Sequence, residues 1–408
     1  MKNRNVAVLF LPLLLASCAG SNPEPKADQP KPAGALNSIT ETNVSTGSGS
    51  GEPNLHTGPS GKTYLTWIER NNTGQSSVKF SVKTAEGWSE PGVIAQSYNM
   101  FVNWADVPSL VELPGGVLAA HWQVSLPDAD EGYNVSVAIS KDEGKTWSKP
   151  VTPHRDGKKG EHGFVSLSQA PGDKGVSILW LDPRKLKDEE GDVALMQTTV
   201  ALDGKLGSEL EVDPRVCECC QPTAIPVPGG LLAVYRDRSP EEIRDIVVSR
   251  FDGNKWSEPT TVGVDNWKIL ACPIQGPAIS MAGQNVAVAW FTAANDKPKV
   301  QVAVSKDGGK TFGSAVQVDD GNPIGRVDVV ALDSGGAIVT WIENVAQAGE
   351  VRVREVGASG EKLDARTVAK TSLGNASGFP KIERSGSEFV FAWTDTEAGK
   401  VRTAVGKP

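Results

Sequence analysis

Short apolar runs that read as β-strands alternate along this chain with turns that contain glycine. In each repeat, a segment that begins with proline or a small residue leads into such a turn. An apolar run then follows, and it ends in an aromatic residue and a polar or charged one. The aromatic anchors, which lie 51 to 58 residues apart, are Trp67, Trp122, Trp180, Tyr235, Trp290, Trp341 and Trp393.

A repeat of about fifty residues built from strands is typical of the blades of a β-propeller. Each unit reads as four antiparallel strands, which in the second unit are expected near 107–113, 117–123, 133–139 and 149–153. We therefore predict an all-β propeller of four-stranded blades, with seven blades favoured and six as the alternative. The seventh unit ends after its third strand. We expect residues 37–46 to supply the missing strand and close the ring, which would remove exposed edges.

The amino-terminal segment has the features of an export signal. Residues 1–17 combine a basic start with a short apolar run, and Leu15-Ala16-Ser17-Cys18 resembles a bacterial lipobox. The resemblance implies lipidation at Cys18 and, with Ala19, an outer-membrane lipoprotein facing the periplasm or the cell surface. The alternative is an ordinary signal peptide with a chance cysteine. Residues 18–36 are expected to form a disordered tether, and 37–408 the propeller.

Charge and composition limit the classes of molecule that this protein is expected to bind. The chain of 408 residues is 39% hydrophobic, which is ample for one large domain, and its net charge is −8. No basic stripe offsets this charge, so we expect no nucleic-acid binding. The expected partners are the membrane, through the lipid anchor, and a glycan, a small anionic ligand or a protein.

Two turns carry a sharper motif. Ser140-Lys-Asp142-Glu-Gly144-Lys-Thr146-Trp147 and its counterpart from Ser305 to Phe312 match the pattern S-x-D-x-G-x-T-[W/F]. The chain thereby resembles the sialidase-like (BNR-repeat) propellers, in which this pattern is the Asp-box. We expect Asp142 and Asp307 to be structural, because a carboxylate at this position can accept backbone N–H groups of its own turn.

The resemblance is weaker where sialidases carry out their chemistry. That family uses an arginine triad, a tyrosine nucleophile paired with glutamate, and an aspartate acid/base. The first arginine normally stands in an [FY]-R-I-P motif, where this chain has Glu52-Pro53-Asn54, and its last tyrosine is Tyr235 in the fourth unit. Hydrolysis of sialosides or other glycosides therefore stays an alternative.

Arginines and carboxylates concentrate in the loops expected at one end of the channel. A pocket for an anionic or sugar-like ligand would use Arg as a bidentate clamp, and solvated loop charge is the other interpretation. The candidate ligand-binding residues are Arg184, Arg236, Arg238 and Arg326. The candidate catalytic residues are Asp182, Asp237 and Glu241.

The cysteines supply a second candidate site. Cys217 and Cys272 occupy equivalent places in adjacent units, near Cys219 and Cys220. In an exported protein we expect a disulfide that includes Cys272. The alternatives are a soft metal such as Cu(I) or Zn(II), bound by these thiolates and His162, and thiols that stay buried or free. The leading hypothesis is thus a lipid-anchored propeller that recognises a ligand at its channel mouth, with a glycoside hydrolase and a metal or redox protein as competitors.

Overall fold

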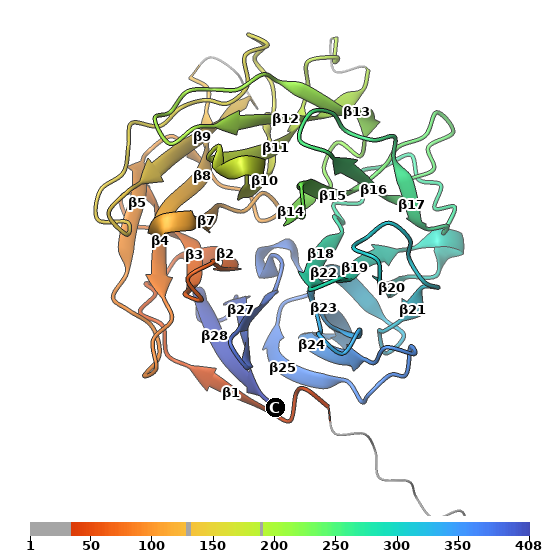
Figure 1. Ribbon diagram of the computed structural model, residues 1–408. Helices are drawn as coiled ribbons and strands as arrows, with labels where there is room; N and C mark the ends of the chain where they lie inside the picture. The colour runs from red at the N-terminus through yellow and green to blue at the C-terminus, as the bar shows by residue number, and fades with distance from the viewer. Residues whose placement is uncertain (1–33, 128–131, 188–190) are drawn as a thin grey trace, which may run out of the picture. The chain divides into compact units, whose positions relative to one another are not determined.

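The computed structural model describes residues 34–127, 132–187 and 191–408. The unit from Gly34 to Pro408 is a β-propeller of seven antiparallel sheets arranged around a central axis (Figure 1). Four short 3-10 helices are the helical elements of these residues: η1 (Pro114–Gly116), η2 (Pro171–Asp173), η3 (Ala294–Asp296) and η4 (Asn375–Ser377). Within the same residues, no helix has the length and apolar character needed to span a membrane. The predicted signal segment 1–17, Cys18 and most of the tether lie outside the described residues.

The first four blades follow the chain order. Blade 1 contains β2 (Ser50–Thr57), β3 (Thr63–Arg70), β4 (Ser76–Val82) and β5 (Gly92–Ser97). Blade 2 contains β6 (Met100–Phe101), β7 (Ser109–Leu113), β8 (Val117–Ser125) and β9 (Tyr133–Ser140). Blade 3 contains β10 (Gly163–Gln169), β11 (Val176–Asp182), β12 (Val193–Val200) and β13 (Leu210–Val216). Blade 4 contains β14 (Thr223–Val227), β15 (Gly230–Arg236), β16 (Ile246–Phe251) and β17 (Thr260–Gly263).

The last three blades complete the ring. Blade 5 contains β18 (Ala278–Ala282), β19 (Asn285–Thr292), β20 (Lys299–Ser305) and β21 (Val316–Gln317). Blade 6 contains β22 (Pro323–Ala331), β23 (Ala337–Val345), β24 (Ala348–Val356) and β25 (Arg366–Thr371). Blade 7 contains β26 (Lys381–Ser385), β27 (Glu388–Asp395), β28 (Lys400–Lys407) and the amino-terminal strand β1 (Ser38–Thr42). The prediction of seven blades is confirmed.

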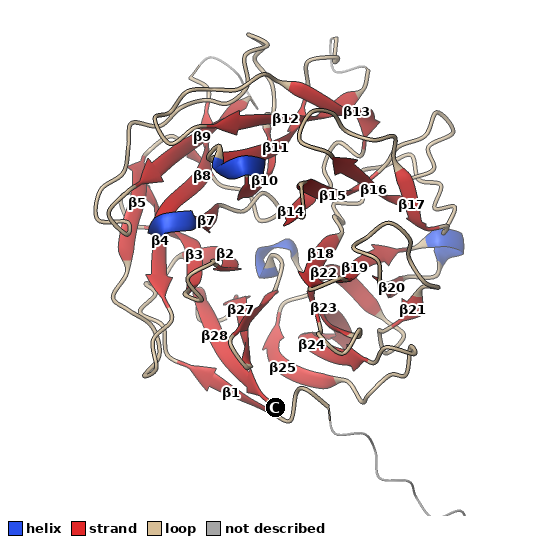
Figure 2. Ribbon diagram, in the orientation of Figure 1, coloured by secondary structure: helices blue, strands red, loops and turns tan. Residues whose placement is uncertain are grey.

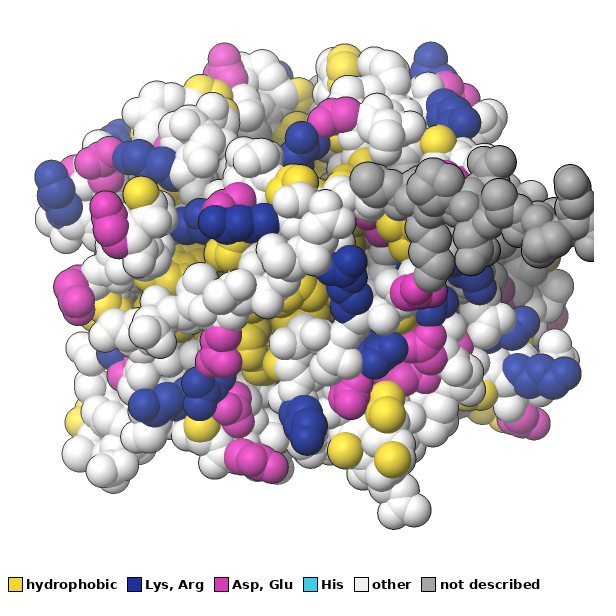
Figure 3. Space-filling model, turned by 90° about the horizontal axis from the view of Figure 1, so that it is seen from below, with side chains coloured by type: hydrophobic (Ala, Val, Ile, Leu, Met, Phe, Trp, Pro, Cys, Tyr) yellow, Lys and Arg dark blue, Asp and Glu magenta, His cyan; other side chains and the backbone are white. Residues whose placement is uncertain are grey.

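The amino-terminal strand closes the ring as predicted. β1 pairs antiparallel with β28, from Ser38 opposite Lys407 to Thr42 opposite Thr403. The two strands lie side by side at the bottom of Figure 1, where the two ends of the described chain meet. The side of the propeller seen in Figure 3 carries basic and acidic side chains interspersed.

Buried tryptophans pack between neighbouring blades. Trp180 of β11 lies in one apolar cluster with blades 2 and 3, and Trp341 of β23 lies in another with blades 5 and 6. A buried indole N–H needs an acceptor, and the acid two residues further along the strand supplies it. Trp180 Nε1 donates to Asp182 Oδ2 at 2.7 Å, and Trp341 Nε1 donates to Glu343 Oε2 at 2.6 Å. The acids that follow these two aromatic anchors therefore have a structural reason.

The innermost strands are joined by side chains. An inner strand has one edge without a partner strand, so its backbone N–H groups need other acceptors. Phe164 N donates to Asp106 Oδ2 of the preceding blade, Ala224 N to Ser166 Oγ, and Ile382 N to Asp328 Oδ2, over 2.8 to 3.0 Å. At these three junctions a side-chain oxygen of one blade thus joins the inner strands of neighbouring blades.

Blade 2 departs from the regular pattern. The strand expected near 149–153 is reduced to a single bridge between Val151 and Val137. Pro150 and Pro153 flank Val151, and because proline has no N–H the ladder cannot extend in either direction. The chain from 152 onward is therefore released from the sheet into the loop that leads to blade 3.

The Asp-box turns are held by their carboxylates. Asp142 Oδ1 accepts the Thr146 N–H at 2.9 Å, and its Oδ2 accepts the Thr146 hydroxyl at 2.6 Å. Asp307 accepts the same two groups of Thr311 at 3.0 and 2.6 Å. The hydroxyl bond from Thr146 is the main cause that lowers the pKa of Asp142 to about 2, and the Thr311 hydroxyl lowers that of Asp307 in the same way.

These depressed pKa values predict a pH-dependent contribution. A lowered folded-state pKa stabilises the fold above the unfolded pKa of about 3.9, and the contribution is lost as the pH falls toward about 2. We expect the variant Asp142→Asn/Asp307→Asn to melt below the wild type at pH 6. The difference between the two should shrink below about pH 4. Thermal melts from pH 2 to 7 measure this, and a difference that does not change with pH would contradict it.

Candidate functional site

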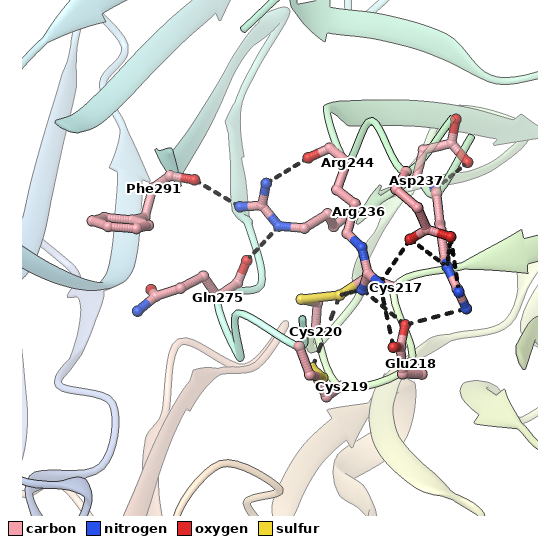
Figure 4. Close-up of a disulfide and its surroundings, with 12 residues drawn as sticks. Cys217, Glu218, Cys219, Cys220, Arg236, Asp237, Arg244, Gln275 and Phe291 are labelled. Atoms are coloured by element: carbon pink, nitrogen blue, oxygen red, sulfur yellow. Dashed lines mark hydrogen bonds and ion pairs between the residues drawn. A yellow bond between two sulfur atoms is a disulfide. The ribbon is translucent and has the colours of Figure 1, made fainter. Parts of the chain in front are cut away.

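The four cysteines of the described chain pair as two disulfides at the entry to blades 4 and 5. Cys217 pairs with Cys220, three residues apart (Figure 4). Cys219 pairs with Cys272, 53 residues apart. The expected disulfide with Cys272 is confirmed. The sulfurs of Cys217, Cys219 and Cys220 lie within 4.8 Å of one another, so the metal alternative has geometric support only.

A charged network joins the Cys217–Cys220 loop to the loop after β15. The buried Arg244 donates to Glu218 Oε2 at 2.8 Å and to Glu242 Oε2 at 3.1 Å, and it contacts Cys217 Sγ at 3.5 Å. Arg238 donates to both oxygens of Glu242 at 3.0 and 3.1 Å. Arg238 is the main cause that lowers the pKa of Glu242 to about 2. Each guanidinium therefore already holds a carboxylate.

Arg236 lies elsewhere than expected. Its side chain is buried, and its guanidinium donates to the carbonyl oxygens of Gln275, Arg244 and Phe291 at 2.6 to 2.9 Å (Figure 4). It also lies 4.9 Å from the centre of the Trp267 ring. Burial lowers its pKa to about 9. Arg236 thus connects blade 4 to blade 5, and its donors are not available to a ligand.

The Arg326 side chain lies across the central channel, at the end where the candidate loops were expected. It lies 4.6 Å from the centre of the Trp104 ring, and Trp104 stacks on Phe379. Trp104 belongs to blade 2 and Arg326 to blade 6, and these blades are not neighbours, so the contact crosses the centre of the ring. Arg326 also donates to Gly374 O, beside η4, which lies in the middle of Figure 2. The channel mouth expected to bind a ligand is covered by these side chains.

The three candidate catalytic carboxylates have different surroundings. Asp182 accepts Trp180 Nε1 and pairs with Arg184 at 2.7 Å, and Arg184 also donates to Glu209 at 2.9 Å. Glu241 is exposed and accepts the hydroxyl of Ser239. Burial raises the pKa of Asp237 to about 6. Asp182 resembles Glu343, because each acid lies two residues after a tryptophan of the second strand of its blade and accepts the indole N–H of that tryptophan.

His162 lies in a group of its own, with His154 and Asp156. It is not part of the group formed by Cys217, Cys219 and Cys220, so the structure separates two parts of the predicted metal site. Burial lowers the pKa of His154 to about 4, so its imidazole is neutral at pH 7.

The central channel contains a cavity of about 350 Å³. The inner strands of all seven blades line it, and the polar lining includes His56, Gln221, Lys381, Asp328 and Glu383. The buried His56 Nε2 and Gln221 Oε1 have no hydrogen-bond partner among the described residues. Burial raises the pKa of Glu383 to about 8 and also raises that of Asp328.

These lining residues are absent from the site predicted by sequence. One signal could have found them, because polar side chains alternate along several inner strands or just before them, as in Asn54 and His56, Gln221 and Thr223, or Lys381 and Glu383. Alternate residues of a strand point to one face. In the innermost strand that face is the channel.

Comparisons with known proteins agree with this architecture. The BNR repeat-like domain family matches residues 61–352. The chain belongs to this family. Among curated proteins no match was found for this BNR repeat-like protein. A protein of unknown function from Dyadobacter fermentans shares its fold, with 14% identity, a TM-score of 0.52, and coverage of 91% of this chain and 98% of the other.

Two further structures are more distant from the BNR repeat-like protein. An α-L-arabinanase from Penicillium chrysogenum, solved with arabinobiose, has 12% identity, a TM-score of 0.49, and coverage of 90% of this chain and 98% of the other. The NanB sialidase of Streptococcus pneumoniae has 12% identity and a TM-score of 0.42, covering 92% of this chain and 71% of the other. At such identities the similarity concerns the fold and not the activity.

Proposed function

We propose that this BNR repeat-like protein recognises a small carbohydrate-like ligand in its central channel. The observation that carries the proposal is one cavity on the axis of the ring whose lining combines hydrogen-bond donors and acceptors, among them Asn54, Gln221, Lys381, Asp328 and Glu383. Such a lining can pair with the hydroxyl groups of a ligand, which both donate and accept. The volume of about 350 Å³ lies at the lower end of the roughly 300–1,000 Å³ typical of small-molecule sites.

The charges of the lining favour a neutral polyhydroxylated ligand over a strong anion. Lys381 is accompanied by the carboxyl groups of Asp328 and Glu383, so the cavity has no excess of positive charge to attract an anion. At the covered end of the channel, Arg184 and Arg238 already bind carboxylates, and an anion would have to displace them. A sugar needs donors and acceptors of both kinds, which this lining provides.

We expect Lys381→Met to weaken ligand binding by about tenfold or more, because a hydrogen bond from a charged group contributes roughly 1.5–3 kcal/mol. Saturation-transfer NMR with a panel of mono- and disaccharides identifies the ligand, and calorimetry measures the variant. Lys370→Met, an exposed lysine on the outer strand β25, is the matched control. Equal affinities of the two variants, or no saccharide bound by the wild type, would overturn the channel as the site.

Glycoside hydrolysis is the second candidate function. One observation favours it: burial raises the pKa of Glu383 to about 8, so this carboxyl group stays protonated at pH 7 inside the cavity. A protonated carboxyl group can serve as the general acid of glycoside cleavage. Release of product from the bound saccharide would support hydrolysis, and Glu383→Gln should abolish it while binding persists.

We further propose that the protein is exported and lipid-anchored to the outer membrane. Two disulfides support an oxidising compartment. Cys18→Ser should release the protein from the membrane fraction into the soluble periplasmic or extracellular fraction. Mass spectrometry of the amino-terminal peptide should find the acyl groups at Cys18 of the wild type. A Cys18→Ser protein that stays in the membrane fraction would contradict the anchor.

A further inference from the structure

Three side chains that can bind a metal, His154, Asp156 and His162, lie close together in the loop 152–162. This loop follows the single bridge at Val151 and connects blade 2 to blade 3. Nε2 of His162 lies 3.2 Å from Oδ1 of Asp156, and Nδ1 of His154 lies 3.7 Å from the same oxygen. One ligand atom from each residue lies within 4.8 Å of the other two. The two imidazole rings are parallel, with their centres 3.6 Å apart, so their in-plane lone pairs converge on one ion only after the rings tilt toward each other.

The group is buried and incompletely hydrogen-bonded. The side chains of His154, Asp156 and His162 are 5%, 6% and 0% exposed. His162 Nε2 and Asp156 Oδ1 can share one hydrogen bond. Three other buried atoms have no partner among the described residues: His154 Nε2, His162 Nδ1 and Asp156 Oδ2. Because buried polar atoms rarely stay unpaired, hydrogen bonds within the group do not account for its burial. An ion bound by His154 Nδ1, Asp156 Oδ1 and His162 Nε2 would leave these three other atoms as they are.

We propose that His154, Asp156 and His162 bind one divalent transition-metal ion of the zinc class. Two ligands of a tetrahedral zinc ion, bound at 2.0–2.1 Å, lie about 3.3 Å apart, which is close to the two observed separations. Two imidazoles and one carboxylate suit zinc and its neighbours in the first transition row better than calcium or magnesium, which prefer oxygen ligands. Three protein ligands leave one position for water or another molecule.

The loop is held from both neighbouring blades, so the segment that carries the three ligands is in place before any ion binds, and only the rings need to tilt. His162 N donates to Tyr133 O of blade 2 at 3.1 Å. On the side of blade 3, Arg155 donates to Gly207 O at 2.7 Å and Lys158 donates to Leu186 O at 3.0 Å. A metal would therefore fasten the loop that joins two blades, at the point where blade 2 lacks a full outer strand.

The site is distinct from the cysteine pairs and from the channel cavity. None of its three residues belongs to the cysteine group or to the cavity lining. The neighbouring charges that act on His154 include Asp182 and Arg184, which form an ion pair with each other. The two opposite charges largely offset each other, so the nearby arginine does not repel a cation by itself.

Metal binding to the purified, disulfide-intact protein tests the proposal. After treatment with a chelator and dialysis without reductant, the wild type should take up one zinc per chain, measured by elemental analysis and calorimetry. Cobalt should give visible d–d bands without the near-ultraviolet thiolate charge transfer that a cysteine site would show. Cys219→Ser/Cys272→Ser should retain the zinc. No saturable uptake of zinc, or cobalt bands with thiolate charge transfer, would overturn the proposal.

Isosteric variants locate the ion. Asp156→Asn and His162→Gln should weaken zinc binding by more than about 100-fold, because even outer-shell substitutions cost 10–100-fold. Asp173→Asn, an exposed aspartate of η2, is the matched control and should bind as the wild type does. If Asp156→Asn binds zinc as tightly as the control, the assignment is wrong.

A readout on the wild type covers the case in which the variants do not fold. Near-ultraviolet circular dichroism checks each metal-free variant. For the wild type, excess zinc must raise the melting temperature, since a ligand that binds only the folded state stabilises it in proportion to its saturation. An unchanged melting temperature over a hundredfold range of zinc concentration would also overturn the proposal.

Discussion

Deletion of residues 37–46 will destabilise the propeller by at least about 5 kcal/mol, because the last blade loses its outer strand and the ring its closure. The strand β1 forms five register pairs with β28, and each net hydrogen bond contributes roughly 1 kcal/mol. The deletion also displaces Leu36, which is buried between blades 6 and 7. A loss of this size is comparable with the whole stability of a typical domain, roughly 5–15 kcal/mol.

Denaturant titration with circular dichroism, together with size-exclusion chromatography, measures this loss. A synthetic peptide of residues 37–46 should restore part of it in trans, since it can pair with the exposed edge of β28. Glu41→Gln is the matched control. It removes only the exposed pair with Arg402 and should leave stability within about 0–1 kcal/mol of the wild type. A deleted protein as stable as the wild type would refute closure by β1.

Removal of the Cys219–Cys272 disulfide should cost about 4 kcal/mol. In the chain-entropy account, the loss grows with the length of the loop that the bond closes, and these cysteines are 53 residues apart. The same account gives about 2 kcal/mol for Cys217–Cys220, which are three residues apart. We therefore expect Cys219→Ser/Cys272→Ser to melt at a clearly lower temperature than Cys217→Ser/Cys220→Ser, and both to melt below the wild type.

The disulfide prediction also separates the two interpretations of the cysteine cluster. Thiol titration of the denatured wild type should find no free thiol among these four cysteines until a reductant is added. The difference in melting temperature between the wild type and the serine variants should be the same with and without a chelator. Four free thiols, together with copper or zinc that depends on these cysteines, would instead establish the metal alternative.

The repeating pattern of the chain was sufficient to predict the propeller. The aromatic anchors are spaced by one blade each, and the glycine turns and the Asp-box patterns are local in sequence, so their geometry follows from a few adjacent residues. The closing role of residues 37–46 followed from counting, since the seventh unit lacked one strand. A disulfide that includes Cys272 was expected from the export signal, but the sequence did not identify Cys219 as its partner.

The assignment of arginines and carboxylates to a ligand site depended on contacts that a sequence does not contain. Arg236 was interpreted as a clamp, but its three acceptors are backbone carbonyls, two of them in the next blade. Asp182 was interpreted as a catalytic acid, but the indole of Trp180 and Arg184 already hold it. A sequence does not show whether the partner of a polar loop residue is a ligand or another part of the protein.

The sequence by itself thus determined the number of blades, the closure, the turns and the position of the cysteines, because each depends on periodicity or on short spacings. Only the tertiary structure decided which end of the channel is covered, which side chains line the cavity, and that His154, Asp156 and His162 converge. Trp104 meets Arg326 from a blade that is not its neighbour. His154 and His162 meet because two prolines end the outer strand of blade 2 and two blades then hold the loop in place.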